Sequence, residues 1–211
     1  MRKILKFLGL IKLTYYRLIG VKVKFDYTVF FHPKAKIINS GKGGQIKFGR
    51  KTNILKNVTI KIEEEAKIQI EHNVSILENT YIEAGKSAKI NIKEGTFFNR
   101  DCKIIAMQEI NIGKNIAIGP NVSFFDHDHI VKANVKQNWN EFKSDEINIE
   151  DNVWIGSGSI ILRKSNVRHN CVIAAGSIIK EEIPENTIFY HKRKRTKKAI
   201  HFLWHKTGLY N

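Results

Sequence analysis

Aliphatic residues recur every six positions along the second half of the chain. Steps of six from Ile149 lead without a miss to Ile155, Ile161, Val167, Ile173 and Ile179. The series two residues earlier begins with aliphatic residues and continues with small ones, in the order Ile147, Val153, Ser159, Ser165, Cys171 and Ser177. The same step connects Ile110, Ile116 and Val122 upstream. Fainter matches, at Ile68 and Val74 and at Ile70, Ile76 and Ile82, indicate that the repeat begins before residue 70.

A period of six predicts an all-β solenoid of triangular cross-section. Each short strand forms one face, three hexads make a turn, and one aliphatic residue per hexad points into the prism. Gly113, Gly119 and Gly156 directly follow inward aliphatic residues, where corners need an unusual φ or a close backbone approach. A β-sandwich would instead show an alternation of two bounded by turns and would not keep this phase.

Two segments break the hexads. Residues 125–146 are polar and shift the phase, so we expect a loop that protrudes from the solenoid, a usual place for function. Residues 1–20 carry apolar positions at helical spacing with cations between them, which predicts a short amphipathic helix. That helix could lie at an anionic membrane surface, or it could pack against the solenoid or a neighbouring subunit.

The charge of the chain lies at its ends. The formal net charge is +16, yet residues 37–189 are nearly balanced, while 1–36 hold nine Lys or Arg against Asp26 and 190–211 hold seven without an acid. We therefore divide the chain into a basic N-terminal segment (1–36), a solenoid domain (37–189) and a basic C-terminal tail (190–211). No apolar run is long enough to span a bilayer, and the two cysteines form no disulfide framework. These features favour a cytoplasmic protein, with peripheral contact at the inner face of the membrane left open.

Three strings within residues 111–184 resemble the hexapeptide-repeat O-acetyltransferases: IGKNIAIGPNVSFFDHDH, INIEDNVWIGSGSIIL and CVIAAGSIIKEEIP. This family includes the maltose and galactoside acetyltransferases and enzymes that acetylate bacterial surface polysaccharides. The resemblance implies a left-handed parallel β-helix, transfer of an acetyl group from acetyl-CoA to a sugar hydroxyl, and a homotrimer with active sites between subunits. It implies acetyl-CoA as a co-substrate and no prosthetic group.

The family's catalytic base is a histidine, and its spacing from Val122 maps this role to His129. A histidine suits the role because its pKa near neutrality lets it take a proton from a hydroxyl and return it to the leaving thiolate. His127 is the rival base, and it is assigned with Asp128 to substrate binding. Either Asp126 or Asp128 could orient an imidazole.

The family also places an acceptor-binding asparagine at Asn99, although this could equally be a corner residue with a left-handed backbone. Met107 stands where the galactoside enzymes carry an acceptor-binding carboxylate, so a different acceptor is expected. Trp154 is expected to be an aromatic wall between subunits. The acetyl-CoA ligands that the resemblance implies are Ser157, Ala175, Lys180, Arg195 and Lys198, of which the last two would bind phosphates.

Three alternatives remain beside O-acetyl transfer. The same site could acetylate an amino sugar. A zinc-dependent carbonic anhydrase-like protein on the same fold would use His127 and His129, but a third histidine with matching spacing is missing, so we expect no metal. A non-catalytic protein would bind nucleic acid or membrane through its basic ends. We expect no nucleic-acid partner, and the acceptor sugar is not identified.

Overall fold

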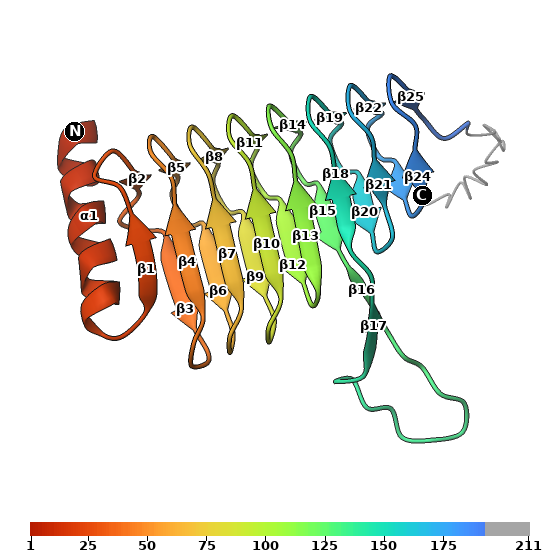
Figure 1. The fold of residues 1–211 in the computed structure, drawn as a ribbon, viewed down its shortest axis with the longest axis horizontal. Coiled ribbons are helices and arrows are strands. Elements are labelled where there is room, and N and C mark those ends of the chain that lie inside the picture. Colours follow the sequence, from red (N-terminus) through yellow and green to blue (C-terminus); the bar gives the residue numbers. More distant parts are fainter. Residues whose placement is uncertain (193–211) are drawn as a thin grey trace, which may run out of the picture.

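The computed structural model describes residues 1–192 and consists of one helix followed by short strands (Figure 1). Helix α1 (Arg2–Leu18) lies across the N-terminal end of a prism whose three faces are parallel sheets. The chain visits the first, second and third sheets in turn and then repeats the cycle. We call the edge between the second and third sheets the 2/3 corner, and the edge between the third and first sheets the 3/1 corner.

The strands of each sheet follow the order of the turns. The first sheet contains β1 (Lys22–Phe25), β4 (Gln45–Phe48), β7 (Lys67–Ile70), β10 (Lys89–Ile92), β13 (Glu109–Ile112), β18 (Ile147–Ile149), β21 (Asn166–Val167) and β24 (Glu182–Ile183). The second contains β2 (Phe30–Phe31), β5 (Asn53–Ile54), β8 (Ser75–Ile76), β11 (Phe97–Phe98), β14 (Ala117–Ile118), β19 (Trp154–Ile155), β22 (Val172–Ile173) and β25 (Ile188–Phe189). The third contains β3 (Lys36–Asn39), β6 (Thr59–Ile62), β9 (Tyr81–Ala84), β12 (Lys103–Ala106), β15 (Ser123–Phe125), β20 (Ile160–Leu162) and β23 (Ile178–Ile179).

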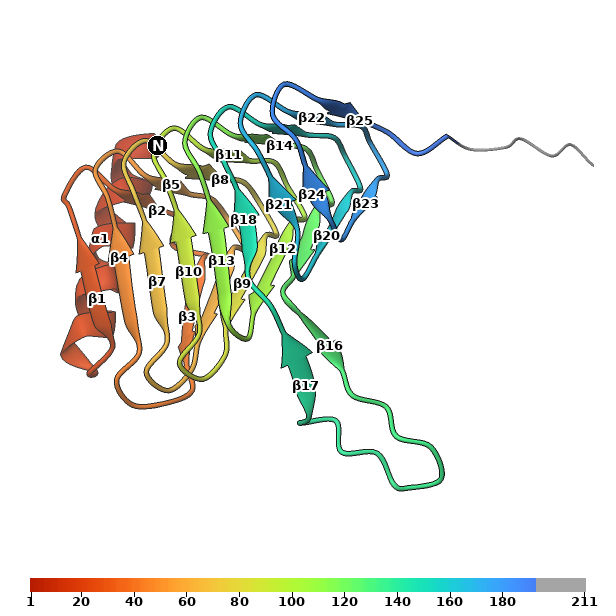
Figure 2. The ribbon, with the colours of Figure 1, turned by 45° about the vertical axis from the view of Figure 1, so that its right-hand side comes forward.

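The solenoid winds to the left. In Figure 2 the chain climbs along the first sheet on the near side, crosses the top of the prism in the second sheet and descends behind it in the third. The turns advance to the right during this cycle, which is a left-handed path. The all-β, left-handed parallel β-helix with an N-terminal helix and a protruding loop is therefore confirmed. Because residues 1–36 already contain α1, β1 and β2, the solenoid begins at Lys22.

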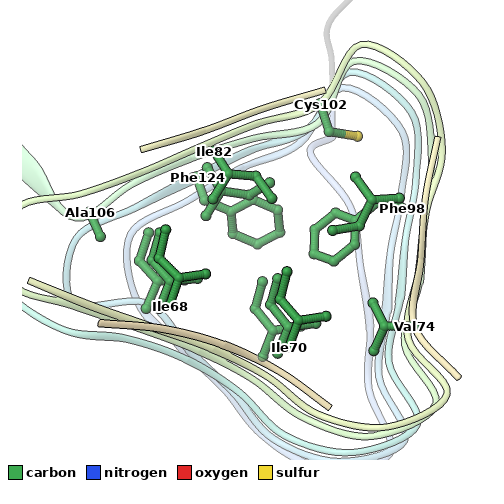
Figure 3. Packing of buried hydrophobic residues seen from close by; sticks show 14 of the residues in the cluster. Ile68, Ile70, Val74, Ile82, Phe98, Cys102, Ala106 and Phe124 are labelled. Carbon is green, nitrogen blue, oxygen red and sulfur yellow. The ribbon is translucent and has the colours of Figure 1, made fainter. Parts of the chain in front are cut away.

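The predicted inward series forms the core. All six residues of the series from Ile149 to Ile179 are buried, as are the small residues of the partner series, including Ser159 and Ser177. Figure 3 shows side chains from the three sheets meeting inside the triangle, with Cys102 at the 2/3 corner and Ala106 at the 3/1 corner. Each buried aliphatic side chain contributes roughly 1.5–3 kcal/mol of hydrophobic free energy. The hexad pattern thus predicted the residues of the core correctly.

The length of a turn departs from three hexads in the N-terminal half. Asn148 pairs with Asn166, 18 residues on, but Gln45 pairs with Lys67, 22 residues on. The earlier turns are longer because their strands in the first and third sheets have four residues, two of which point inward. The weaker hexad signal before residue 100 has this cause.

Two kinds of residue allow the chain to turn at the corners of the prism. A Cβ on Gly156 would lie 2.5 Å from the Ala175 nitrogen, and one on Gly119 would lie 2.7 Å from the Ser157 nitrogen, so these glycines permit a close backbone approach without a left-handed φ. Most non-glycine residues with a left-handed φ at the corners are instead asparagines, which tolerate this conformation. They are Asn57, Asn73, Asn79, Asn115, Asn121, Asn152, Asn170 and Asn186.

Helix α1 covers the open N-terminal end of the prism. Gly9 and Leu13 are buried against it, and a Cβ on Gly9 would lie 1.7 Å from the Phe31 carbonyl oxygen. The Lys12 ammonium donates to the carbonyl oxygens of Pro33 at 2.8 Å and Ala35 at 2.7 Å. Of the two placements weighed for this helix, packing against the solenoid is the one observed.

The buried ladder makes a prediction about stability. Ile60 of β6 is fully buried, whereas Ile38 of the neighbouring strand β3 is 43% exposed. We expect Ile60→Ala to lower the free energy of unfolding by about 2–5 kcal/mol, because it leaves a cavity inside the prism. The matched change Ile38→Ala should cost no more than about 0.5 kcal/mol. Urea unfolding followed by circular dichroism compares the two, and equal losses would contradict the assigned burial.

Candidate active site

The protruding loop is a β-hairpin that leaves the solenoid at the 3/1 corner, between β15 and β18 (Figure 1). Its two strands, β16 (His127–His129) and β17 (Phe142–Ser144), pair antiparallel, with His127 opposite Ser144 and His129 opposite Phe142. The sequence predicted the loop but not the ladder at its base. This ladder fixes the direction of the side chains that carry the candidate chemistry.

The two histidines lie on one face of the hairpin because alternate residues of a strand share a face. Their rings meet edge to face with centroids 5.8 Å apart. The ring of Trp139 approaches His129 in the same way at 6.0 Å, and that of Phe142 approaches His127 at 5.8 Å. His129 itself is exposed, so a molecule in solution can reach its imidazole.

Asp126 is the carboxylate that supports the histidines. It is fully buried and accepts hydrogen bonds from the backbone nitrogens of Met107 and Gln108, both at 2.7 Å. Its Oδ1 also lies 3.3 Å from Nδ1 of His127, whose side chain is only 12% exposed. Between the two aspartates that the sequence left open, Asp126 is therefore the one placed to orient an imidazole. Met107 takes part through its backbone rather than through its side chain.

Asp128 points to the opposite face of the hairpin. Its Oδ2 accepts hydrogen bonds from Arg163 Nε at 2.6 Å and from the Lys180 ammonium at 3.0 Å. These two cations, Arg163 first, lower the pKa of the Asp128 carboxyl. Arg163 also pairs with Asp145, so it ties both strands of the hairpin to the next turn. The structure thus brings Lys180 to the base of the loop, where it contacts a carboxylate.

A second polar cluster lies beside His127 on the third sheet. Glu83 accepts hydrogen bonds from Lys61 Nζ at 2.6 Å and from the Tyr81 hydroxyl at 2.7 Å. Burial alone raises the pKa of Glu83, but the two hydrogen bonds and the charge of Lys61 outweigh it and lower that pKa, with a further contribution from His127. Burial and the bond to Glu83 raise the pKa of Tyr81 to about 12. The hexad pattern did not reveal this cluster, whose residues Lys61 and Glu83 the 22-residue turn brings together.

The other predicted ligands lie at the 2/3 corner. Asn99, Ser157 and Ala175 follow β11, β19 and β22 respectively, so they lie at the same edge of the prism. Asn99 accepts a hydrogen bond from the Arg100 nitrogen at 2.8 Å and does not have a left-handed φ, which removes the corner explanation for it. Trp154 projects from β19 and is 58% exposed. Within one chain, the width of the third sheet separates these residues from His129.

Two of the predicted phosphate ligands, Arg195 and Lys198, lie outside the described residues. Within residues 1–192, no three His, Cys, Asp or Glu side chains converge as a set of metal ligands. His127 and His129 accordingly have no third ligand in that part of the chain.

Comparison with known proteins supports the resemblance seen in the motifs. No family model matches the chain. It is 35% identical over 98 residues to a galactoside O-acetyltransferase of Escherichia coli, covering 46% of this chain and 48% of the relative. It is 28% identical over 106 residues to the galactoside O-acetyltransferase of Lactococcus lactis, covering 50% and 51%. The polysialic acid O-acetyltransferase OatWY has a similar fold, with a TM-score of 0.56 at 15% identity over 84% of this chain and 94% of that one.

The resemblance to hexapeptide-repeat O-acetyltransferases is confirmed. The chain spans about half the length of the curated relatives that it matches. The likeness to OatWY extends the agreement in fold to most of the solenoid.

The double ion pair of Arg163 predicts how the hairpin is held. We expect Arg163→Gln to accelerate amide hydrogen exchange in β16 and β17, because Asp145 loses its ion pair and Asp128 keeps only its contact with Lys180. Arg168→Gln is the matched control, since Arg168 bridges Glu150 and Glu182 away from the hairpin. Exchange measured by mass spectrometry should change in the hairpin for the first variant only. Unchanged exchange in Arg163→Gln would show that other contacts hold the loop.

Proposed function

We propose that the protein transfers an acetyl group from acetyl-CoA to a sugar hydroxyl, in the biosynthesis of a bacterial surface polysaccharide. The observation that carries this proposal is the exposed imidazole of His129 on a rigidly anchored hairpin of a hexad solenoid. Such a group is accessible to an acceptor and is suited to proton transfer near neutral pH. The similarity to galactoside O-acetyltransferases supports the same chemistry.

His129 acts as the general base in the proposed mechanism. Its imidazole takes the proton of the acceptor hydroxyl as the oxygen attacks the thioester carbonyl carbon. The tetrahedral intermediate then expels the CoA thiolate, which receives that proton from the imidazolium. His127, held beside Asp126, positions the His129 ring through their edge-to-face contact. Acetyl-CoA is a co-substrate, and no prosthetic group takes part in these steps.

Direct transfer without an acyl-enzyme fits the state of the cysteines. Cys102 and Cys171 are both buried. Burial raises the pKa of the Cys102 thiol to about 11, which keeps it protonated and poorly nucleophilic near neutral pH. Neither thiol is accessible to a bulky thioester. The buried cysteines therefore offer no route to a thioester acyl-enzyme, which supports direct transfer from CoA to the acceptor in one complex.

A homotrimer would complete the site from two corners of the prism. His129 lies at the 3/1 corner and the predicted ligands Asn99, Ser157 and Ala175 lie at the 2/3 corner, so one subunit would supply the base and its neighbour the pantetheine and acceptor contacts. Large apolar side chains stand exposed on the outer faces of the second and third sheets, as an interface requires. They include Phe97, Trp154, Ile178 and Ile188. In this arrangement Arg195 and Lys198 supply positive charge for the CoA phosphates, while Lys180, the other cation expected to contact acetyl-CoA, pairs with Asp128 at the base of the hairpin.

Substitution of the histidines tests the mechanism. We expect His129→Ala to lower kcat for thiol release from acetyl-CoA by about 10²–10⁴-fold, since proton transfer is lost. His127→Ala should lower kcat less, because it removes a positioning contact. A panel of neutral sugars and amino sugars serves as acceptors. Release with amino sugars alone would replace the hydroxyl acceptor by an amine, and stoichiometric zinc required for activity would contradict the mechanism.

We also propose that α1 rests on an anionic membrane surface, at the cytoplasmic face. Within the described residues, no helix is long and apolar enough to cross a bilayer. The face of α1 opposite Gly9 and Leu13 is nevertheless apolar and 45–80% exposed. It consists of Ile4, Phe7, Leu8, Ile11, Tyr15 and Leu18. Residues 1–25 contain seven Lys or Arg and no acid, which suits anionic lipid and disfavours pairing of two such helices.

Vesicle binding tests this contact. We expect Phe7→Ser with Ile11→Ser to weaken co-sedimentation with phosphatidylglycerol vesicles about tenfold or more, since two large side chains no longer enter the interface. The control pair Tyr27→Ser with Ile38→Ser removes exposed apolar residues outside α1 and should bind like the parent. Equal binding of all three proteins, or no preference for anionic over zwitterionic vesicles, would refute the membrane role.

A further inference from the structure

The outer face of the first sheet differs from the other two faces. Every outward residue of its strands is polar, and in the N-terminal half most of these are lysines or amides. Here a groove of about 690 Å³ crosses β1, β4, β7 and β10. Six cations line it: Arg17, Lys22, Lys24, Lys47, Lys67 and Lys89. None of the described residues that line the groove is acidic.

The register of the sheet places like charges side by side in this groove. Lys24 pairs with Lys47 across β1 and β4, and Lys67 pairs with Lys89 across β7 and β10. Like charges directly opposite on neighbouring strands are destabilising. Within residues 1–192, no carboxylate lies within ion-pair distance of Lys24, Lys47 or Lys67.

Elsewhere the solenoid avoids such repulsion. Lysines of one turn face glutamates of an adjacent turn, as Lys61 does with Glu83 at 2.6 Å and Lys114 with Glu94 at 3.3 Å. A single Glu in place of a lysine or glutamine on the first sheet would neutralise the groove in the same way. Because the groove lysines have no such partner, an anionic ligand would relieve their repulsion.

The groove leads to the candidate active site. At its C-terminal end, the Lys89 ammonium lies 3.3 Å from Glu109 of β13. The preceding residue, Gln108, donates its backbone N–H to Asp126 and accepts a hydrogen bond from Ser144 of the hairpin at 3.0 Å. The four strands of the groove span about 14 Å, so a ligand along it would be an extended chain.

We propose that this groove binds the anionic chain of the acceptor, a glycan with repeated carboxylate or phosphodiester groups. The role of the ligand as acceptor rests on the proposed acetyl transfer, but binding of the ligand to the groove can be measured without that reaction. The amides of Gln45, Gln69 and Asn91 line the groove beside the lysines and suit sugar hydroxyls. None of the described lining residues is aromatic, so the groove offers no platform on which nucleic-acid bases stack.

Binding of defined glycans tests the groove directly. The probes are oligogalacturonate, a phosphodiester-linked teichoic acid, neutral dextran and duplex DNA, measured by calorimetry at 0.1 M salt. We expect one or both anionic glycans to bind and dextran not to. Lys47→Gln with Lys67→Gln should weaken that binding about tenfold or more, because two charged contacts are lost. The control Lys36→Gln with Lys103→Gln, which removes two exposed lysines from the third sheet, should change it less than about twofold.

His129→Ala separates this inference from the proposed reaction. That variant should bind the anionic glycan like the parent. Glycan binding by the groove would therefore remain supported even if acetyl transfer were not observed. Three results would overturn the groove: no binding of either anionic glycan, equal losses in the two lysine pairs, or tighter binding of DNA than of both anionic glycans. The first result would leave acetyl transfer to a neutral acceptor untouched.

Discussion

In-register parallel pairing between successive turns is the constraint on which this structure depends. Each inward residue packs against its counterpart one turn away, as Ile46, Ile68, Ile90 and Ile110 do along the first sheet. A slip of one residue would turn these side chains to solvent and bring lysines and amides into the prism. The buried ladder therefore fixes the outward residues as firmly as the inward ones. Outward residues one turn apart therefore stand in columns along each face, and a binding surface on this fold is made of such columns.

The same constraint explains how a hairpin can protrude without losing its place. The inserted residues leave after β15 and return to β18 in the register of the ladder, because Ile110 pairs with Ile147 across the insertion. Asp126 satisfies two backbone nitrogens at the exit, where a buried unpaired donor would cost about 1–3 kcal/mol. On the other side, Arg163 joins both strands to the following turn. Contacts with the preceding and following turns thus hold the base of the hairpin, and with it the two histidines, against the solenoid.

The sequence predicted the inward residues because a period of six leaves a regular trace of Ile and Val. It also predicted the loop, since 125–146 breaks that trace, and the histidines within it. It could not predict which aspartate supports His127, because both contact the solenoid: Asp126 accepts bonds from the preceding turn and lies beside His127, whereas Asp128 pairs with Arg163 of the following turn. Nor did it reveal the pairs Lys61–Glu83 and Lys67–Lys89, which are 22 residues apart. Turn length is set by strand length, and the four-residue strands of the earlier turns weaken the hexad signal without revealing the 22-residue spacing.

The three faces of the prism differ in the residues that point outward from them. The second and third sheets carry exposed aromatic and aliphatic residues such as Trp154 and Ile178, which favour contact with another protein surface. The first sheet has polar outward positions throughout and is left to solvent and ligand. Because the hairpin departs at the corner between the third and first sheets, His129 lies where a protein-facing surface meets a solvent-facing one. In the proposed trimer, a site at that edge would receive acetyl-CoA from the boundary between subunits and the proposed extended acceptor from the open face.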